Sequence, residues 1–289
     1  MSDLLVRLFG WRGALVHGNT TVIDRWRYLT RHLPRARGTG ERVLDVGCGT
    51  GAFTMGMASR GYKAVGLSWD KRNQAIAEKR ARYARVQAVS FPICDVRHLD
   101  KQTDLLGAFD IAICFETIEH VLDDRKLLAD IYACLKPGGR LFLTTPNYYY
   151  RSSKYDMGPF SQSEDGWHVR RGYSPAMLKE LCDSVGFEIE EIDYVSYMLS
   201  QVVTRLQTWM SLGPMRFLGR PLLWLLTLPL RPIPFVFDSW LGRLLSRAFG
   251  WPGYCIAISA YKRRCTTLPA KTVDQTVGPG MTERYANAS

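Results

Sequence analysis

Residues 43–61 read VLDVGCGTGAFTMGMASRG, and this stretch decides the fold. It begins as an apolar strand, turns through glycines at alternate positions, and continues into a helical pattern. Because Gly47, Gly49 and Gly51 have no Cβ atom, the backbone can turn tightly and bring the amide groups at a helix N-terminus close to a ligand. A glycine-rich turn after the first strand of an alternating unit marks the place where a doubly wound sheet has its ligand crevice.

Short apolar runs and helical patterns alternate from Arg42 to Asn147, as is typical of a parallel sheet with helices on both faces. Further along, Ser174 is an N-cap candidate before Pro175, and Gly186 ends the same helix. We therefore expect an α/β fold with a Rossmann-like, doubly wound sheet of seven mostly parallel strands. The expected strands are Arg42–Val46, Lys63–Leu67, Gln87–Cys94, Phe109–Phe115, Arg140–Thr145, 187–196 and Tyr254–Tyr261, and the expected helices before Ser174 lie near Ala52–Arg60, Lys71–Ala84 and Asp123–Leu135.

The chain divides into five parts by composition and pattern. Residues 1–36 carry an amphipathic pattern that predicts a helical cap over the site. Residues 37–196 are the expected core, and residues 253–265 add its last strand. Between these two parts, residues 197–252 form an apolar and basic helical insertion. Residues 266–289 have low hydrophobicity and no periodicity, which predicts a disordered tail.

The insertion is unexpectedly long, because the strands on either side of it are usually joined by a short connection. Its length therefore indicates a function of its own. Its centre, residues 220–237, is strongly apolar but interrupted by prolines, so it is better suited to an interface than to spanning a bilayer. Six arginines and one aspartate give residues 197–249 a net charge of +5, which favours an anionic leaflet. A lid on the core and a dimer interface remain alternatives. The tryptophans available as interfacial anchors are Trp209, Trp224 and Trp240.

The formal net charge of the whole chain is +11, which predicts an anionic partner. The basic residues are dispersed rather than gathered around aromatic platforms, which argues against nucleic acid. The seven cysteines are scattered without a CxxC pair, and this pattern is typical of a reducing cytoplasm. Arg7 and Arg12 interrupt the first apolar stretch, so a signal peptide is not expected. These features predict a cytoplasmic protein in peripheral contact with the inner membrane face.

Asp45 decides between two kinds of cofactor. Dinucleotide-binding turns have the spacing G-x-G-x-x-G, whereas the spacing here is G-x-G-x-G, and Asp45 precedes it by two residues. A carboxylate at that point would repel a pyrophosphate but can hold an amino group, directly or through water. The stretch resembles motif I of the class I S-adenosylmethionine-dependent methyltransferases. The resemblance continues through FDIAICFETIEHV, LKPGGRLFLTTPN and YSPAMLKELCDSVGF, and it implies S-adenosylmethionine as the cofactor.

The second strand departs from that family, since Leu67 stands where most relatives have an acidic residue for the ribose hydroxyls. The segment GLSWDKRNQ instead resembles cyclopropane-fatty-acid-synthase-like methyltransferases, which implies a ribose role for Ser68 and Asn73. Asp70 competes for that role, and helix N-capping is the structural alternative for Ser68 and Asp70. The resemblance assigns the remaining cofactor contacts to Asp95 and the backbone of Val96 for adenine, and to Phe115 and Glu116 at the end of the fourth strand; an Asx turn is the alternative for Asp95.

Glu116, Glu119 and His120 lie on one turn of chain, and such clusters can bind a divalent metal. The pattern resembles ubiquinone-biosynthesis O-methyltransferases and small-RNA 2′-O-methyltransferases, yet it also occurs in metal-free methyltransferases. Metal binding therefore stays open. His168 is expected in the loop that covers the site, where an imidazole can accept a hydroxyl proton; a loop histidine bonded to backbone is the alternative. We expect Glu119 and His120 to shape the same catalytic pocket.

These observations predict an O-methyltransferase acting on a hydrophobic or lipid-linked acceptor at a membrane surface. A cyclopropane-synthase-like enzyme that alkylates a lipid carbon is the alternative of the same class. An RNA-binding or catalytically silent S-adenosylmethionine-binding module is the alternative of another class. The sequence leaves the acceptor, the methylated atom and the oligomeric state undetermined.

Overall fold

The computed structural model describes residues 2–17, 20–150, 160–197, 200–202, 240–249 and 252–264. Most of the predicted insertion and the predicted tail lie outside these described residues. Within them, no helix combines the length and apolar character needed to cross a bilayer.

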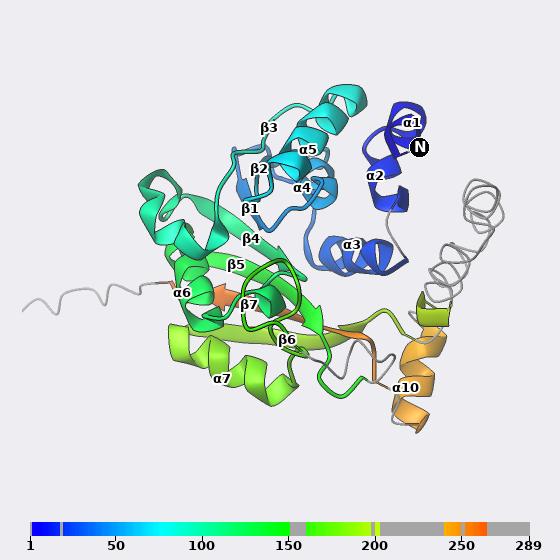
Figure 1. Ribbon diagram of the computed structural model, residues 1–289, viewed down its shortest axis with the longest axis vertical. Coiled ribbons are helices and arrows are strands. Elements are labelled where there is room, and N and C mark those ends of the chain that lie inside the picture. The colour runs from blue at the N-terminus through cyan, green and yellow to red at the C-terminus, as the bar shows by residue number, and fades with distance from the viewer. Residues whose placement is uncertain are drawn as a thin grey trace, which may run out of the picture.

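The sheet has seven strands in the order β3-β2-β1-β4-β5-β7-β6 (Figure 1). All neighbouring pairs are parallel except those of β7, which runs antiparallel to both β5 and β6. This arrangement confirms the predicted doubly wound, mostly parallel sheet. The strands are β1 (Arg42–Val46), β2 (Lys63–Leu67), β3 (Val89–Ser90), β4 (Phe109–Phe115), β5 (Leu135–Pro146), β6 (Phe187–Val195) and β7 (Cys255–Lys262).

Two strands differ in length from the expected ones by more than one residue. Strand β3 is only two residues long, because it lies at the sheet edge, Ala88 has a φ of 57°, and Pro92 has no N–H to donate. A parallel bridge between Ser68 and Ile93 is all that continues the pairing. Strand β5 instead begins at Leu135, and its pairing with β4 shifts register around the glycines before Arg140.

The helices begin and end where the sequence signals them. Asp70 caps α5, Asp123 caps α6 and Ser174 caps α7 through side-chain bonds to backbone N–H groups. Gly186 ends α7 with a φ of 92°, a left-handed conformation that glycine adopts without strain. The helices of the core and the last described part of the insertion are α4 (Ala52–Ala58), α5 (Lys71–Ala84), α6 (Asp124–Cys134), α7 (Pro175–Val185) and α10 (Arg243–Phe249), with short 3₁₀ segments η1 (Val96–Lys101), η2 (Thr103–Leu105) and η3 (Ile118–His120).

Alternating residues of the central strands supply two separate cores. In β4, Ala112 and Cys114 belong to the cluster that includes α6 and α7. Ile111, Ile113 and Phe115 belong to the opposite cluster, which includes α3 and α4. Because successive side chains of a strand point to opposite faces, the sheet is covered on both sides.

Residues 2–32, where a helical cap is predicted, contain α1 (Ser2–Phe9), α2 (Arg12–His17) and α3 (Thr20–His32). Helices α1 and α2 approach very closely, since a Cβ on Gly13 would lie 2.4 Å from the Leu5 carbonyl oxygen. Helix α3 contributes the buried Tyr28 and Leu29 to the same core as α4, and Leu33 directly after the helix joins them. This packing places α3 beside the end of β4, where the site begins.

Candidate functional site

A cleft of about 470 Å³ opens where β1, β2 and β4 end at their carboxyl edge. This is the position at which a doubly wound sheet binds its ligand, and the volume is typical of a small-molecule site. Of the predicted cofactor and catalytic residues, the cleft is lined by Gly47, Gly49, Ser68, Asn73, Asp95, Val96, Glu116 and His120. Asp45, Gly51, Phe115, Glu119 and His168 are not among the lining residues.

The three glycines of the turn have different reasons for being glycine. All have positive φ angles of 78°, 52° and 78° in chain order. A Cβ on Gly47 would lie 2.2 Å from Thr117 Oγ1, and a Cβ on Gly51 would lie 2.8 Å from the Phe91 ring. A Cβ on Gly49 would meet nothing within 4 Å. Packing therefore requires the outer two glycines, while the middle one leaves bare backbone beside the cleft for a ligand to approach.

Asp45 lies beneath the turn, not on the cleft wall. Its side chain is buried, and its Oδ2 accepts a hydrogen bond from Thr54 Oγ1 at 2.6 Å. Burial raises the pKa of Asp45 to about 6, and the Thr54 hydrogen bonds oppose that rise. The carboxylate thus ties the first turn of α4 to the end of β1, and its predicted contact with the amino group stays a prediction.

Ser68 and Asp70, which follow β2, have different hydrogen-bonding roles. Asp70 accepts from the Arg72 N–H at 2.8 Å and so caps α5, which is the structural alternative considered for it. Ser68 Oγ accepts from the Asp70 N–H at 3.2 Å. Both residues and Asn73 still line the cleft, so ribose binding by Ser68 and Asn73 remains compatible with this geometry.

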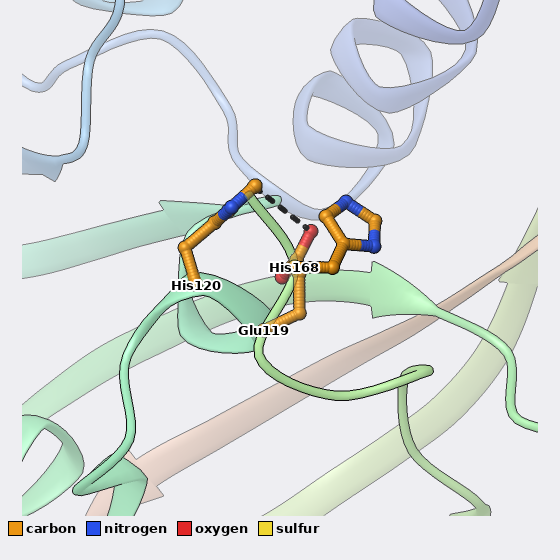
Figure 2. Close-up of side chains that lie close together, drawn as sticks. All are labelled: Glu119, His120 and His168. Atoms are coloured by element: carbon orange, nitrogen blue, oxygen red, sulfur yellow. Dashed lines mark ion pairs between the residues drawn. The ribbon is translucent and has the colours of Figure 1, made fainter. Parts of the chain in front are cut away.

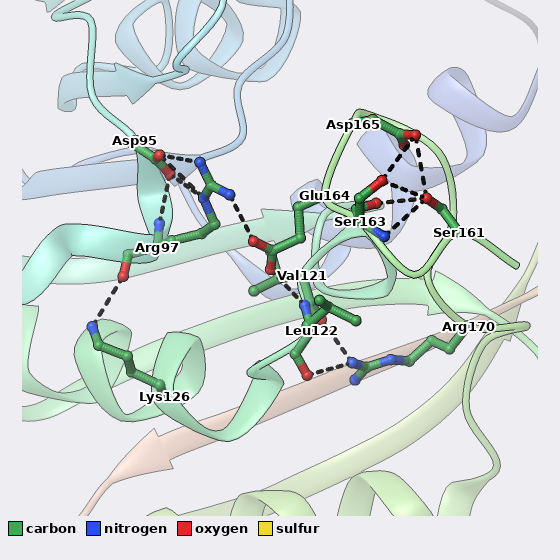
Figure 3. Close-up of polar contacts among 10 residues, drawn as sticks. All are labelled: Asp95, Arg97, Val121, Leu122, Lys126, Ser161, Ser163, Glu164, Asp165 and Arg170. Atoms are coloured by element: carbon green, nitrogen blue, oxygen red, sulfur yellow. Dashed lines mark hydrogen bonds and ion pairs between the residues drawn. The ribbon is translucent and has the colours of Figure 1, made fainter.

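The Asp95 side chain forms hydrogen bonds and an ion pair with Arg97, two residues further along the chain. It accepts from the Arg97 N–H at 3.1 Å, which is the Asx turn considered as an alternative, and from Arg97 Nε at 2.8 Å. The hydrogen bonds from the Arg97 side chain lower the pKa of Asp95 more than its partial burial raises it. The same guanidinium donates through Nη1 to Glu164 at 2.6 Å, and Glu164 accepts from the Leu122 N–H at 2.6 Å (Figure 3).

Glu116 joins the end of β4 to the N-terminal helices. Its φ of 50° is unusual for a non-glycine residue. Its Oε2 lies 2.9 Å from Arg25 Nη2 of α3, and its Oε1 accepts from Thr144 Oγ1 at 3.1 Å. Phe115, the residue before it, is buried and packs edge-on against Phe53 with ring centroids 5.1 Å apart. Phe115 is therefore a core residue beside the cleft.

Glu119, His120 and His168 come together, although the last two are 48 positions apart (Figure 2). The two imidazole rings lie edge to face with centroids 4.7 Å apart. The Val169 N–H donates to the Glu119 carbonyl at 3.0 Å, which holds the His168 loop against η3. Glu119 is fully buried, and burial raises its pKa well above its usual range, with the Glu116 carboxylate adding to the rise. Its charged form therefore needs a compensating partner in the cluster.

The three side chains also fit a divalent metal. One ligand atom from each lies within 4.8 Å of the others, and two imidazoles with one carboxylate form a common donor set for transition metals. Glu119 Oε1 and His120 Nδ1 are buried atoms without a hydrogen-bond partner. Glu116, which the sequence grouped with this cluster, is instead paired with Arg25.

A family model described as "Methyltransferase domain" matches residues 20–192 of the chain. The match covers more than half of the chain, and the strand order agrees with it. The chain belongs to the class I S-adenosylmethionine-dependent methyltransferases. It is accordingly a methyltransferase of class EC 2.1.1, and its cofactor is S-adenosylmethionine.

Two curated relatives show the extent of the similarity. The chain is 26% identical over 165 residues to a ubiquinone biosynthesis O-methyltransferase of Marinobacter nauticus, covering 55% of this chain and 68% of that protein. It is 28% identical over 163 residues to the enzyme of the same name from Coxiella burnetii, with the same shares covered. The similarity is therefore distant and leaves almost half of this chain unmatched.

Solved structures support the fold. A phosphoethanolamine N-methyltransferase of Haemonchus contortus aligns with a TM-score of 0.59 at 20% identity, covering 91% of this chain and 61% of that one. An S-adenosylmethionine-dependent methyltransferase of Methanosarcina mazei aligns with a TM-score of 0.53 at 15% identity, covering 82% and 97%. At such low identity these structures show that the fold is shared and say nothing of the acceptor.

The methyltransferase cleft includes residues that the sequence alone did not indicate. Trp69 and Arg72 follow β2, Thr117 follows Glu116, and Arg97 and Glu164 meet across the opening. Arg97 could have been suspected from the spacing Asp-x-Arg, which permits a local ion pair. Glu164 and the buried Arg25 had no sequence signal, because their partners are 67 and 91 positions away.

Proposed function

We propose that this methyltransferase transfers the methyl group of S-adenosylmethionine to an oxygen atom of a hydrophobic or lipid-linked acceptor. The observation that carries the proposal is the gathering of His168, His120 and Glu119 beside the cofactor cleft. Methyl transfer from a sulfonium is an in-line displacement, so the protein must align the acceptor and remove its proton. His168 is suited to accept that proton, because imidazole titrates near neutrality.

In the transfer step, the acceptor oxygen forms a bond to the methyl carbon while the bond from that carbon to sulfur breaks, and S-adenosylhomocysteine leaves. The hydroxyl proton passes to the His168 imidazole. Buried Glu119, held by Thr145 Oγ1 at 3.2 Å, positions the loop that carries His168 through its carbonyl oxygen.

A metal-assisted form of the same reaction is the second candidate, favoured by the donor set of Glu119, His120 and His168. When bound, a divalent cation would lower the pKa of an acceptor hydroxyl as a Lewis acid. The two forms differ in their response to a chelator. Metal-assisted transfer stops with EDTA and resumes when the cation is returned, whereas transfer that depends on His168 as the base continues.

Exposed aromatic residues near the cleft support an apolar acceptor. Trp69 lines the cleft itself, and Trp167 is 71% exposed beside His168. Tyr148 and Tyr149 are also exposed, just after β5 ends at Pro146. Exposed aromatic side chains beside a cleft are suited to contact an apolar ligand. The printed name of the curated relatives, which refers to ubiquinone biosynthesis, is consistent with a lipid-linked acceptor.

The test is methyl transfer from isotopically labelled S-adenosylmethionine into a total membrane lipid extract. A methoxy product identified by mass spectrometry supports the proposal, whereas a cyclopropane or methyl-branched acyl chain supports the lipid-alkylating alternative. Transfer into RNA, or tight and salt-sensitive RNA binding without transfer, supports the nucleic-acid alternative.

His168→Gln is expected to slow transfer about 100-fold, which is the lower end of the usual contribution of a general base, and to leave S-adenosylhomocysteine affinity within about twofold. His98→Gln is the matched control, because His98 is an exposed histidine of η1 outside the cleft lining. Full activity of His168→Gln at neutral and mildly acidic pH would remove His168 from the mechanism.

A further inference from the structure

The loop of residues 160–172 carries His168 and is attached to the core by two charged pins. Glu164 is the first pin and contacts Arg97 and the Leu122 N–H. Arg170 is the second, and it forms an ion pair with Asp124. It also donates to the carbonyl oxygens of Val121 and Leu122 at 2.7 Å (Figure 3). His168 lies between the two pins, so its position depends on both.

The loop is also braced internally. Asp165 accepts from the hydroxyl groups of Ser161 and Ser163 and from the Trp167 N–H at 3.1 Å. The Ser161 N–H donates to the His168 carbonyl at 3.0 Å. A loop braced in this way moves largely as a unit, so release of one pin displaces His168 as well as the pin residue.

Arg97 joins the first pin to Asp95, the predicted adenine contact. Its Nε and Nη2 face the two oxygens of Asp95 at 2.8 Å and 2.5 Å, and its Nη1 faces Glu164 at 2.6 Å. Asp95 and Glu164 both line the cleft. Only the planar fork of a guanidinium presents donors in both directions at once; a lysine has a single ammonium group.

We propose that Arg97 is a positioning residue that couples occupation of the cofactor cleft to the placement of His168 over the acceptor. The proposal rests on the proposed roles of Asp95 and His168. A cofactor that contacts Asp95 fixes the carboxylate, the fixed carboxylate orients the guanidinium, and the guanidinium holds Glu164 and the loop. By linkage, the factor by which the cofactor stabilises the loop equals the factor by which the attached loop tightens cofactor binding.

Hydrogen exchange with S-adenosylhomocysteine as the probe tests this coupling and needs no acceptor. In the unaltered protein, the probe is expected to slow exchange about fivefold or more both at residues 47–51 and at residues 160–170. In Arg97→Gln and in Glu164→Gln, the slowing at 47–51 persists while the slowing at 160–170 is lost. Calorimetry should show an affinity reduced by about the same factor in both variants.

Three comparisons separate coupling from a general structural effect. Arg97→Lys keeps the charge without the fork and is expected to behave as Arg97→Gln. The double variant Arg97→Gln with Glu164→Gln is expected to show the same exchange and affinity as each single variant. Either change alone already breaks the contact between Arg97 and Glu164. Arg82→Gln removes an exposed arginine of α5 outside the cleft and is the matched control with no expected effect.

Persistent slowing at 160–170 in Arg97→Gln, or additive losses in the double variant, would overturn the proposal. If Arg97→Gln fails to fold, Glu164→Gln alone decides, since Glu164 lies in a surface loop. The hydrogen-exchange experiment does not depend on catalysis. Full activity of His168→Gln would disprove the role of His168 as the base, but the effect of S-adenosylhomocysteine on exchange at residues 160–170 could still be measured.

Discussion

At the scale of single residues, the glycine turn of this methyltransferase shows why one residue type serves two purposes. Gly47 is fixed by its neighbour, since a Cβ would lie 2.2 Å from Thr117 Oγ1. Gly49 has a comparable left-handed backbone but open space where its Cβ would be. The same substitution at the two positions should therefore separate stability from cofactor binding.

Gly47→Ala is expected to lower the free energy of unfolding by about 2–4 kcal/mol, because overpacking adds to left-handed strain. Gly49→Ala is expected to cost only about 1 kcal/mol of strain while weakening S-adenosylhomocysteine binding, because the new methyl group obstructs the open backbone. Urea denaturation and calorimetry measure the two effects. Equal destabilisation by both variants would contradict this division of roles.

We expect the charged Asp45 carboxylate to lower the free energy of unfolding of the free protein while strengthening cofactor binding. Its pKa is about 6 in the folded protein and near 3.9 when unfolded. The unfolded chain therefore releases the proton more readily, so the destabilisation develops between about pH 4 and pH 6 and is complete above pH 6. Its upper bound is about 3 kcal/mol, or about 1.4 kcal/mol for each pKa unit.

Asp45→Asn is accordingly expected to stabilise the free protein, since an amide oxygen can still accept from Thr54. The gain should be about 1 kcal/mol larger at pH 8 than at pH 5, and S-adenosylhomocysteine affinity should fall. Denaturation at the two pH values gives the first result, and calorimetry gives the second. A pH-independent difference in stability would show that Asp45 is not the titrating group.

At the scale of elements, α3 is attached to the site by a buried ion pair. The Arg25 side chain is 11% exposed and the Glu116 side chain 19% exposed. Loss of one partner leaves the other charge buried and poorly compensated, and such losses cost about 3–5 kcal/mol. The Glu116 carboxylate raises the pKa of Arg25 above its usual range even though burial opposes that rise, so the arginine stays charged.

Arg25→Met is therefore expected to lower the free energy of unfolding by about 3 kcal/mol. The double variant Arg25→Met with Glu116→Gln should recover most of that loss, because the glutamine carries no charge and can still accept from Thr144. Arg31→Met is the matched control on the same helix; its side chain is 42% exposed and lies 3.7 Å from Asp193, so it should change stability by less than about 0.5 kcal/mol. A double variant no more stable than Arg25→Met would contradict the buried-charge explanation.

At the scale of the whole molecule, the proposed lipid-linked acceptor would require a surface that brings the protein to a membrane. The predicted membrane-facing insertion lies mostly outside the described residues, but α10 within it exposes Leu244 and Phe249. Helix α1 exposes Leu4, Leu8 and Phe9; in Figure 1 it lies at the upper right and α10 at the lower right. Apolar side chains next to arginines are typical of helices that bind at a bilayer interface.

The methyltransferase is expected to float with vesicles that contain anionic lipid at low salt and to float less at high salt, because surface charges are screened. Vesicles of neutral lipid alone should recover much less protein. Leu244→Ser with Phe249→Ser should reduce flotation at every salt concentration. Protein that stays at the bottom of the gradient with anionic vesicles at low salt would favour a lid or a dimer interface for the insertion.

The sequence by itself determined the sheet, the helix ends and the location of the cleft. These features depend on neighbours in the chain: alternation of apolar residues gives the strands, Asp70, Asp123 and Ser174 cap helices through backbone groups two or three residues away, and glycines permit the turn. The short β3 was mispredicted because its apolar pattern continues past the point where Pro92 and the sheet edge end the pairing.

Only the tertiary structure decided which charged groups meet. Asp95 had the expected position, yet its partner Arg97 and the second carboxylate Glu164 meet across the cleft opening. Glu116 pairs with Arg25 instead of joining Glu119 and His120 in one cluster. The physical reason is that a side-chain ion pair has no periodicity: its energy depends on distance and burial between residues far apart in the chain, and these are set only when the sheet, α3 and the His168 loop have packed.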